Sequence, residues 1–146
     1  MGKRASIVFN KPLPKEAKAD LREFAEVIGE RVMGGKKFVC LLSSDVHLRK
    51  LNSDFLGHDY ATDVLSFPSG EPEELGEMAI SMERASEQAD EQGHTMIEEI
   101  KILMLHGALH LMGMDHEKDK GEMRAAETSW RKELGLGAGL IERARG

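Results

Sequence analysis

Residues 106–116 read HGALHLMGMDH, and this stretch decides how the rest of the chain is interpreted. It holds three of the six histidines, at the spacing H-x3-H-x2-G-x2-H. On a helix, His106 and His110 project from the same face about one turn apart. Gly113 permits a positive φ angle, so the helix can end there and the chain can fold back with His116. Three imidazoles with a fourth position open are the ligand set typical of a catalytic zinc site.

A simpler interpretation is that these histidines form a buried polar cluster near a helix end. The segment Ile97–Met112 is apolar around most of a helix, as expected for a central helix. Two imidazoles in so apolar a helix need partners for their ring nitrogens, and a metal ion meets this need directly. The spacing therefore favours one metal site per chain, formed by His106, His110 and His116.

The spacing also matches the zinc motif H-E-x-x-H-x-x-G-x-x-H of the metzincin proteases, except that Gly107 replaces the glutamate. That glutamate is the general base of those enzymes. A metal lowers the pKa of water towards about 7 even without it, and Asp115 or Glu117 could act as the base from another direction. Peptide hydrolysis is therefore disfavoured but stays open. Phosphodiester cleavage depends more on neutralising and aligning the phosphate, which a metal and basic side chains can do.

The length and composition predict one soluble globular domain. A chain of 146 residues suits a single core, and 40% hydrophobic with 32% charged residues is typical of a folded protein. We expect no signal peptide in residues 1–10, and the apolar tract 102–114 is shorter than the roughly 20 residues that span a bilayer. The single cysteine, Cys40, stands in an apolar run, which predicts a buried thiol. A cytoplasmic location without membrane contact is expected.

The net charge of −6 is unevenly distributed along the chain. Residues 1–50 carry 11 Lys and Arg against 6 Asp and Glu, a net +5, whereas residues 51–146 carry 9 against 20, a net −11. A polyanion could contact the basic half while the acidic half stays solvated. Ordinary solvated surfaces explain the same distribution equally well.

The pattern of apolar residues predicts an α+β fold with a small mixed β-sheet of about four strands. Runs of strand-forming residues alternate with segments whose apolar residues recur at helical spacing. We expect helices to cover the sheet, with a zincin-like histidine helix at the centre of a single domain, residues 1–146. The glycine-rich tail, about 135–146, is expected to be frayed. The expected strands are 7–9, 37–42, 62–67 and 76–80, and the expected helices are 14–34, 44–55, 81–92, 95–112 and 118–134.

The other candidate site residues have weaker support from the sequence. His47, His58 and His94 are each interpreted as surface residues. Asp115 neighbours His116, so it could orient a ligand imidazole as a hydrogen-bond acceptor outside the ligand set, or it could cap the next helix.

Three collinear segments resemble the YbeY family of bacterial rRNA maturation factors. The stretch 106–116 is similar to the family pattern HGxLHLxGxDH. Leu51–Asn52 followed by Thr62–Pro68, TDVLSFP, resembles the second pattern, LN…TDVLSFP. Leu75–Ser81, LGEMAIS, is similar to the LGDI-x-IS strand of the family. The resemblance covers about residues 37–130.

The resemblance implies a zinc-dependent, single-strand-specific endoribonuclease that acts in 3′-end maturation of small-subunit ribosomal RNA and in ribosome quality control. It implies that His106, His110 and His116 hold one Zn²⁺ per chain and that no small organic cofactor is needed. The implied partners are ribosomal RNA and the small ribosomal subunit or its assembly factors. The resemblance also implies an RNA groove beside the metal, lined partly by the basic N-terminal half.

One segment departs from the family pattern. Between LN and TDVLSFP the family usually reads YRGKD-x-P, and the arginine of this segment is important for activity. In this chain the segment is Phe55–Ala61, FLGHDYA, in which Leu56 replaces that arginine. Leucine cannot hold a phosphate through two hydrogen bonds or stabilise charge in the transition state. His58 replaces the lysine and is positive only when protonated. Arg49 or Lys50 could compensate.

These departures leave two alternatives to an RNA hydrolase. Leu56 favours a ribosome-associated binding factor with a structural zinc and weak or no nuclease activity. The metzincin spacing favours a metallopeptidase, against which Gly107 argues.

Overall fold

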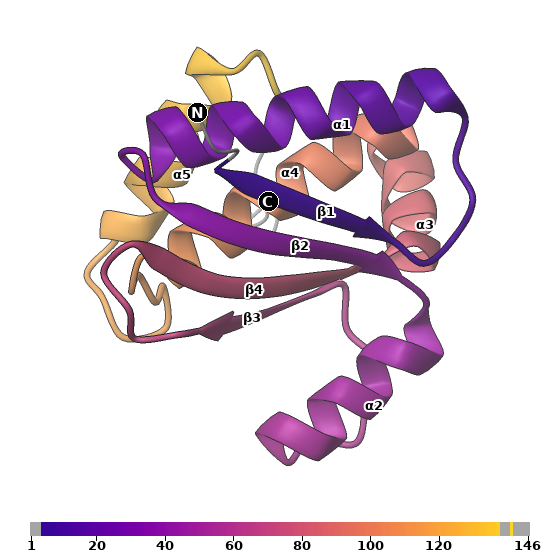
Figure 1. Ribbon diagram of the computed structural model, residues 1–146, viewed down its shortest axis with the longest axis horizontal. Helices are drawn as coiled ribbons and strands as arrows, with labels where there is room; N and C mark the ends of the chain where they lie inside the picture. The colour runs from indigo at the N-terminus through magenta and orange to yellow at the C-terminus, as the bar shows by residue number, and fades with distance from the viewer. Residues whose placement is uncertain (1–3, 138–140, 142–146) are drawn as a thin grey trace.

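Four strands form one mixed sheet in the computed structural model, which describes residues 4–137 and 141 (Figure 1). The sheet order is β1-β2-β4-β3, with β1, β2 and β4 parallel and β3 antiparallel to β4. The predicted α+β class with a small mixed sheet is confirmed. The strands are β1 (Ala5–Phe9), β2 (Lys37–Ser43), β3 (Val64–Pro68) and β4 (Glu74–Ser81).

Helices connect and cover these strands. In Figure 1, α4 runs behind the strands, α1 lies above β1, and α2 stands apart from the other helices, below β3. Among the described residues, no helix has both the length and the apolar character needed to cross a membrane. The helices are α1 (Lys15–Val27), continued by the π-helical segment η1 (Ile28–Val32), α2 (Asp45–Leu56), α3 (Met82–Gln92), α4 (Met96–Leu111) and α5 (Glu122–Glu133).

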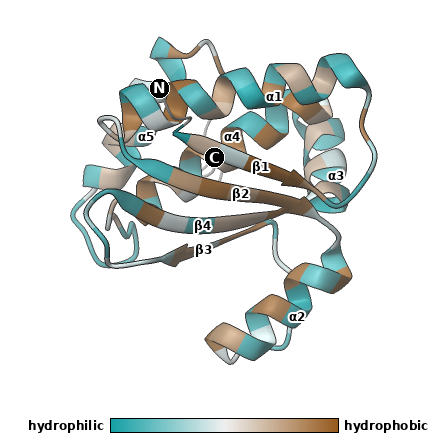
Figure 2. Cartoon of the chain, viewed as in Figure 1, coloured by the Kyte–Doolittle hydropathy of each residue, from teal (hydrophilic) through white to brown (hydrophobic). Residues whose placement is uncertain are grey.

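Two hydrophobic clusters show which helices cover which face of the sheet. The larger one joins strand residues such as Phe38 and Met78 to α1 and α4. The smaller one joins Leu48 of α2 to Leu65 and Ala79. Because successive strand residues point to opposite faces, the neighbours Met78 and Ala79 belong to different clusters. Figure 2 accordingly shows largely hydrophobic strands and outer helices that alternate between hydrophobic and hydrophilic residues.

Helix α4 is the central helix, as predicted from its apolar sequence. Thr95 caps its N-terminus, because the Thr95 hydroxyl accepts the N–H of Glu98 at 3.1 Å. Eleven of its 16 residues are buried. The helix packs against β3 and β4 as well as α1, α3 and α5. This burial fixes the position of the histidines at its C-terminal end.

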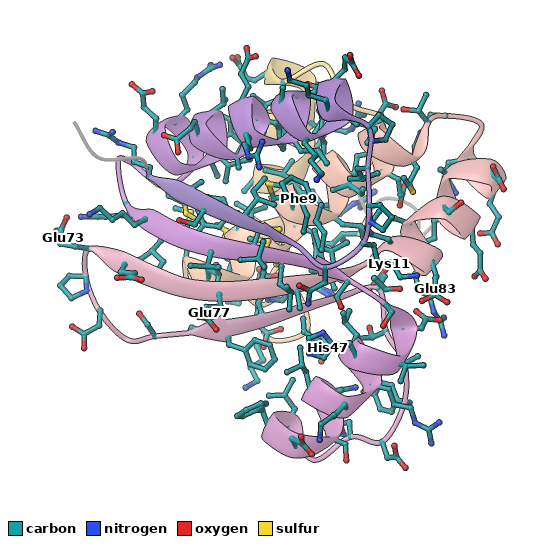
Figure 3. The ribbon with its side chains drawn as sticks, turned by 45° about the vertical axis from the view of Figure 1, so that its right-hand side comes forward. Phe9, Lys11, His47, Glu73, Glu77 and Glu83 are labelled. Carbon is teal, nitrogen blue, oxygen red and sulfur yellow. The ribbon has the colours of Figure 1, made fainter. Side chains whose placement is uncertain are left out.

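The face of the sheet on the α2 side is only partly covered. Figure 3 shows Glu77 on this side together with His47 of α2, whereas Phe9 lies on the side of α1. The cations of Lys18 and Arg22 on α1 lie 5.3 and 5.1 Å from the Phe9 ring centroid. On the open side, a groove of about 240 Å³ is lined by Val8, Val39, Leu41, His47, Leu51, Phe55, Phe67, Glu77, Met78 and Ala79.

The thiol of Cys40 is fully buried in the larger cluster, as predicted. Burial raises the pKa of this thiol to about 12, so it stays protonated near pH 8. Because the thiolate is the reactive form, we expect the native protein to be inert towards the thiol reagent DTNB. Unfolding in guanidinium should release one reactive thiol per chain. Rapid labelling of the folded protein would show that Cys40 is accessible.

The expected element boundaries agree with the structure within a few residues except at the last helix. Helix α5 begins at Glu122, about one turn later than predicted. The Asp119 carboxylate accepts the N–H groups of Gly121 and Met123, each at 2.9 Å. These bonds stabilise a turn before the helix, where the apolar periodicity alone extended the helix too far.

The tail 135–146 is described only in part. Residues 138–140 and 142–146, on which most of the expected fraying falls, lie outside the described residues. Leu136 and Ile141 are both buried in the larger cluster.

Candidate metal centre

His106 and His110 lie one turn apart near the end of α4, as their spacing predicts. Their Nε2 atoms are 3.2 Å apart and their ring centroids 4.8 Å apart. His106 is only 6% exposed, whereas His110 is half-buried. The core therefore surrounds one ring, while the other borders on solvent.

The chain folds back at Gly113 and brings a third ring to the first two. Gly113 has a φ angle of 92°, a conformation that glycine adopts without strain. Its N–H donates to the carbonyl of His110 at 2.9 Å, as is common where helices end. The His116 ring then lies 5.7 Å from that of His106 and 5.9 Å from that of His110, between centroids.

The three rings could together hold a metal ion. One ring nitrogen from each of His106, His110 and His116 lies within 4.8 Å of the others. Two ligands about 2.0–2.1 Å from zinc at a tetrahedral angle stand roughly 3.4 Å apart. The 3.2 Å between the Nε2 atoms of His106 and His110 is close to this separation. Imidazole suits zinc and other divalent transition metals, so the donor set fits such an ion and leaves further positions open.

The surroundings of His110 favour its neutral form. Burial is the main cause that lowers the pKa of this imidazole, and the charge of His106 acts in the same direction. A hydrogen bond with the backbone of Met114 opposes them but does not reverse the shift. The neutral imidazole is the form that binds a metal, so His110 remains available as a ligand at lower pH than an exposed histidine.

The packing of α4 against the sheet explains the glycine after His106. A Cβ atom at Gly107 would lie 3.0 Å from the Met78 sulfur and 3.3 Å from the nearest side-chain atoms of Ser66 and Val64. The Ser66 hydroxyl also donates to the Gly107 carbonyl at 3.1 Å. A glutamate side chain here, as in the metzincin proteases, would require these neighbouring side chains to move. Gly107 itself has no side chain that could act as a general base.

A cleft of about 560 Å³ lies beside the histidines. Its lining residues come from segments 62–68 and 106–117, which are far apart in sequence. These are the two segments that carry the strongest family patterns. The basic half, residues 1–50, was expected to line part of the groove, but all of the residues that line this cleft belong to the acidic part of the chain.

The carboxylate that contacts a clustered imidazole is Glu127 of α5, which the sequence reasoning missed. Glu127 Oε2 lies 2.7 Å from His106 Nδ1, and both side chains are buried. Asp115, by contrast, accepts the N–H of Glu117 at 3.0 Å and so caps a turn. A role for Asp115 in orienting His116 stays a prediction. The sequence did offer one signal for Glu127: it follows Met123 by one helical turn, so it lies on the same, buried face of α5.

The other three histidines lie outside this cluster. His58 is exposed, as predicted, whereas His47 is half-buried with Nδ1 2.8 Å from the Ser43 hydroxyl. His94 is also partly buried, with a side chain that is 15% exposed. Its ring nitrogens lie 3.2 Å from a Glu98 oxygen and 2.6 Å from a Glu99 oxygen, and these contacts explain its burial.

Comparison with known proteins identifies the family to which this chain is similar. The family model described as Endoribonuclease YbeY matches residues 10–135. A protein from Solibacter usitatus named Endoribonuclease YbeY is 50% identical over 141 residues, which cover 97% of this chain and 95% of that protein. A protein of the same name from Koribacter versatilis is 54% identical over 109 residues, covering 75% of this chain and 71% of that protein.

A solved structure extends the similarity to the fold. The solution structure of TM1509 from Thermotoga maritima matches with a TM-score of 0.64 at 29% sequence identity. The match covers 89% of this chain and 88% of that one. With the family model spanning most of its length and the relative from Solibacter usitatus matching nearly end to end, this chain belongs to the Endoribonuclease YbeY family.

Proposed function

We propose that this protein is a zinc-dependent, single-strand-specific endoribonuclease. It acts in 3′-end maturation of small-subunit ribosomal RNA and in ribosome quality control, in the cytoplasm, with the small ribosomal subunit or its assembly factors as partners. One observation carries the proposal: three imidazoles converge on the wall of a cleft of about 560 Å³. The names of the relatives support RNA as the substrate.

Different residues of the cleft would bind the metal ion and accept a proton during hydrolysis. His106, His110 and His116 would hold the ion. A bound zinc ion supplies Lewis acidity at a phosphate oxygen and makes water a stronger acid. Asp115 and Glu117 line the same cleft, and their carboxylates are the candidates to accept the proton of the attacking water.

The proposal is tested by incubating the purified protein with a precursor of small-subunit ribosomal RNA and mapping the new ends. We expect cleavage near the mature 3′ end that a chelator abolishes and added zinc restores. A duplex covering the same site should resist cleavage. Protein that binds zinc but leaves every single-stranded precursor intact would contradict the proposal.

Leu56 is the observation that favours the second candidate, a ribosome-associated binding factor with a structural zinc. It is the last residue of α2 and is 44% exposed, so a charged side chain fits there without disturbing the core. A metallopeptidase has less support, because Gly107 stands in place of the glutamate of that class and is closely packed against Met78, Ser66 and Val64.

We expect Leu56→Arg to raise the rate of RNA cleavage about tenfold, since an arginine can add a charge-assisted hydrogen bond to a phosphate. Single-turnover cleavage of the rRNA precursor measures the effect, and Leu56→Gln is the uncharged control. An unchanged rate would show that position 56 does not reach the RNA backbone. If natural cleavage is barely detectable and rises strongly while ribosome binding stays constant, the binding-factor candidate is favoured.

A further inference from the structure

Glu127 is a buried carboxylate whose two oxygens have different partners. The residue is only 1% exposed. Its Oε2 lies 2.7 Å from Nδ1 of His106, and its Oε1 accepts the backbone N–H of Ile141 at 2.9 Å. A buried carboxylate is costly unless its oxygens are hydrogen-bonded, and these two contacts meet that requirement. The carboxylate therefore connects the histidine cluster to Ile141.

The contact with Glu127 determines which nitrogen of His106 is available to a metal. A carboxylate only accepts hydrogen bonds, so Nδ1 of the neutral His106 ring must carry the proton. Nε2 then has a free lone pair, and it is the atom that lies 3.2 Å from Nε2 of His110. The same contact fixes the rotation of the ring, which directs Nε2 into the cluster.

The burial of the Ile141 side chain fixes the backbone N–H that donates to Oε1 of Glu127. The Ile141 side chain is 8% exposed and belongs to the larger hydrophobic cluster, together with Met123 of α5 and Leu136. The backbone N–H of Ile141 is thereby placed against Glu127. Residue 141 also lies beyond residues 10–135, the part of the chain that the family model matches.

We infer that Glu127, anchored by the N–H of Ile141, is a positioning residue for the metal centre. It holds His106 as the Nδ1–H tautomer with Nε2 directed into the histidine cluster, and Ile141 thereby contributes to metal affinity. This inference rests on the proposed metal-dependent function. Outer hydrogen-bond partners of ligand histidines typically change metal affinity about 10–100-fold, which sets the size of the expected effect.

The first test measures the zinc dissociation constant of the full chain by competition with a chromophoric chelator. We expect Glu127→Gln to weaken binding about tenfold, because it replaces one of the two accepting oxygens by an NH₂ group that can only donate, and Glu127→Ala to weaken it roughly 100-fold. Glu133→Gln is the matched control on the same helix, where the natural carboxylate is exposed, and its affinity should equal that of the natural protein.

The second test separates positioning from mere support of the fold. Long-range ¹H–¹⁵N spectra of the metal-free protein report the tautomer of each histidine. We expect the Nδ1–H form for His106 in the natural protein and in Glu133→Gln, and its loss in folded Glu127→Ala. A purely structural role would lower the thermal midpoint and leave the tautomer unchanged.

A third pair of variants tests the C-terminal anchor. Ile141→Pro removes the N–H, and we expect it to weaken zinc binding roughly threefold to tenfold. Ile141→Val keeps both the N–H and an apolar side chain, so it should bind as the natural protein does. Equal affinity in the two variants would overturn the anchoring role of Ile141.

These outcomes distinguish the inference from the function on which it rests. Tight zinc binding that is equal in the natural protein and both Glu127 variants would overturn the positioning role and leave the proposed function intact. Failure of the natural protein to bind zinc would overturn the metal centre, and the inference with it.

Discussion

Replacing His110 by alanine should remove bound metal and RNA cleavage together. His110 contributes one of the three clustered imidazoles, and its Nε2 lies 3.2 Å from that of His106. Two remaining imidazoles hold zinc far more weakly than three, because each ligand contributes to a site of fixed geometry. We expect bound zinc to fall from one per chain to below about 0.1, and cleavage to fall at least about 100-fold.

Metal analysis after dialysis and cleavage of the rRNA precursor measure the two losses on one preparation. His58→Ala is the control for metal content, since His58 is an exposed histidine outside the cluster. It should keep one zinc per chain. Full cleavage by metal-free His110→Ala protein would mean that RNA hydrolysis does not depend on the histidine cluster.

Restoring the metzincin glutamate through Gly107→Glu should unfold the protein instead of creating a peptidase. The position faces Met78, Ser66 and Val64, all within 3.3 Å of a Cβ atom built there. The new carboxylate would be buried without a cationic partner, which costs about 3–5 kcal/mol, and the longer side chain adds overpacking. Because the whole domain is stable by only about 5–15 kcal/mol, much of the protein should unfold.

Thermal and urea unfolding followed by circular dichroism measure this effect. Gly107→Ala should cost much less, since the Met78 side chain can shift and alanine favours a helix by about 1 kcal/mol over glycine. Ala125→Glu, at an exposed position of α5, controls for the added charge. A folded Gly107→Glu protein with natural stability would show that α4 and the sheet are not in such close contact.

Much of the fold and the histidine cluster was predictable because local rules decide them. Helical periodicity places His106 and His110 on one face, and the glycine at position 113 ends the helix so that His116 can return. The strands were recognised from short apolar runs between turn residues. Each of these patterns depends only on residues that are close together in the sequence.

The features that were missed depend on contacts between distant segments. Glu127 follows His106 by 21 residues, and only the packing of α5 on α4 brings its carboxylate to the ring. The prediction that the basic half lines part of the cleft was wrong for this cleft, since overall charge does not locate side chains in space.

The central claim is that one metal ion held by His106, His110 and His116 is needed for RNA cleavage. The most direct measurement is a titration of metal-free protein with zinc, in which bound metal and the rate of precursor cleavage are followed together. We predict that cleavage rises in proportion to bound zinc and stops rising at one ion per chain. A metal-free protein that cleaves at the full rate, or a fully loaded one that does not cleave, would contradict the claim.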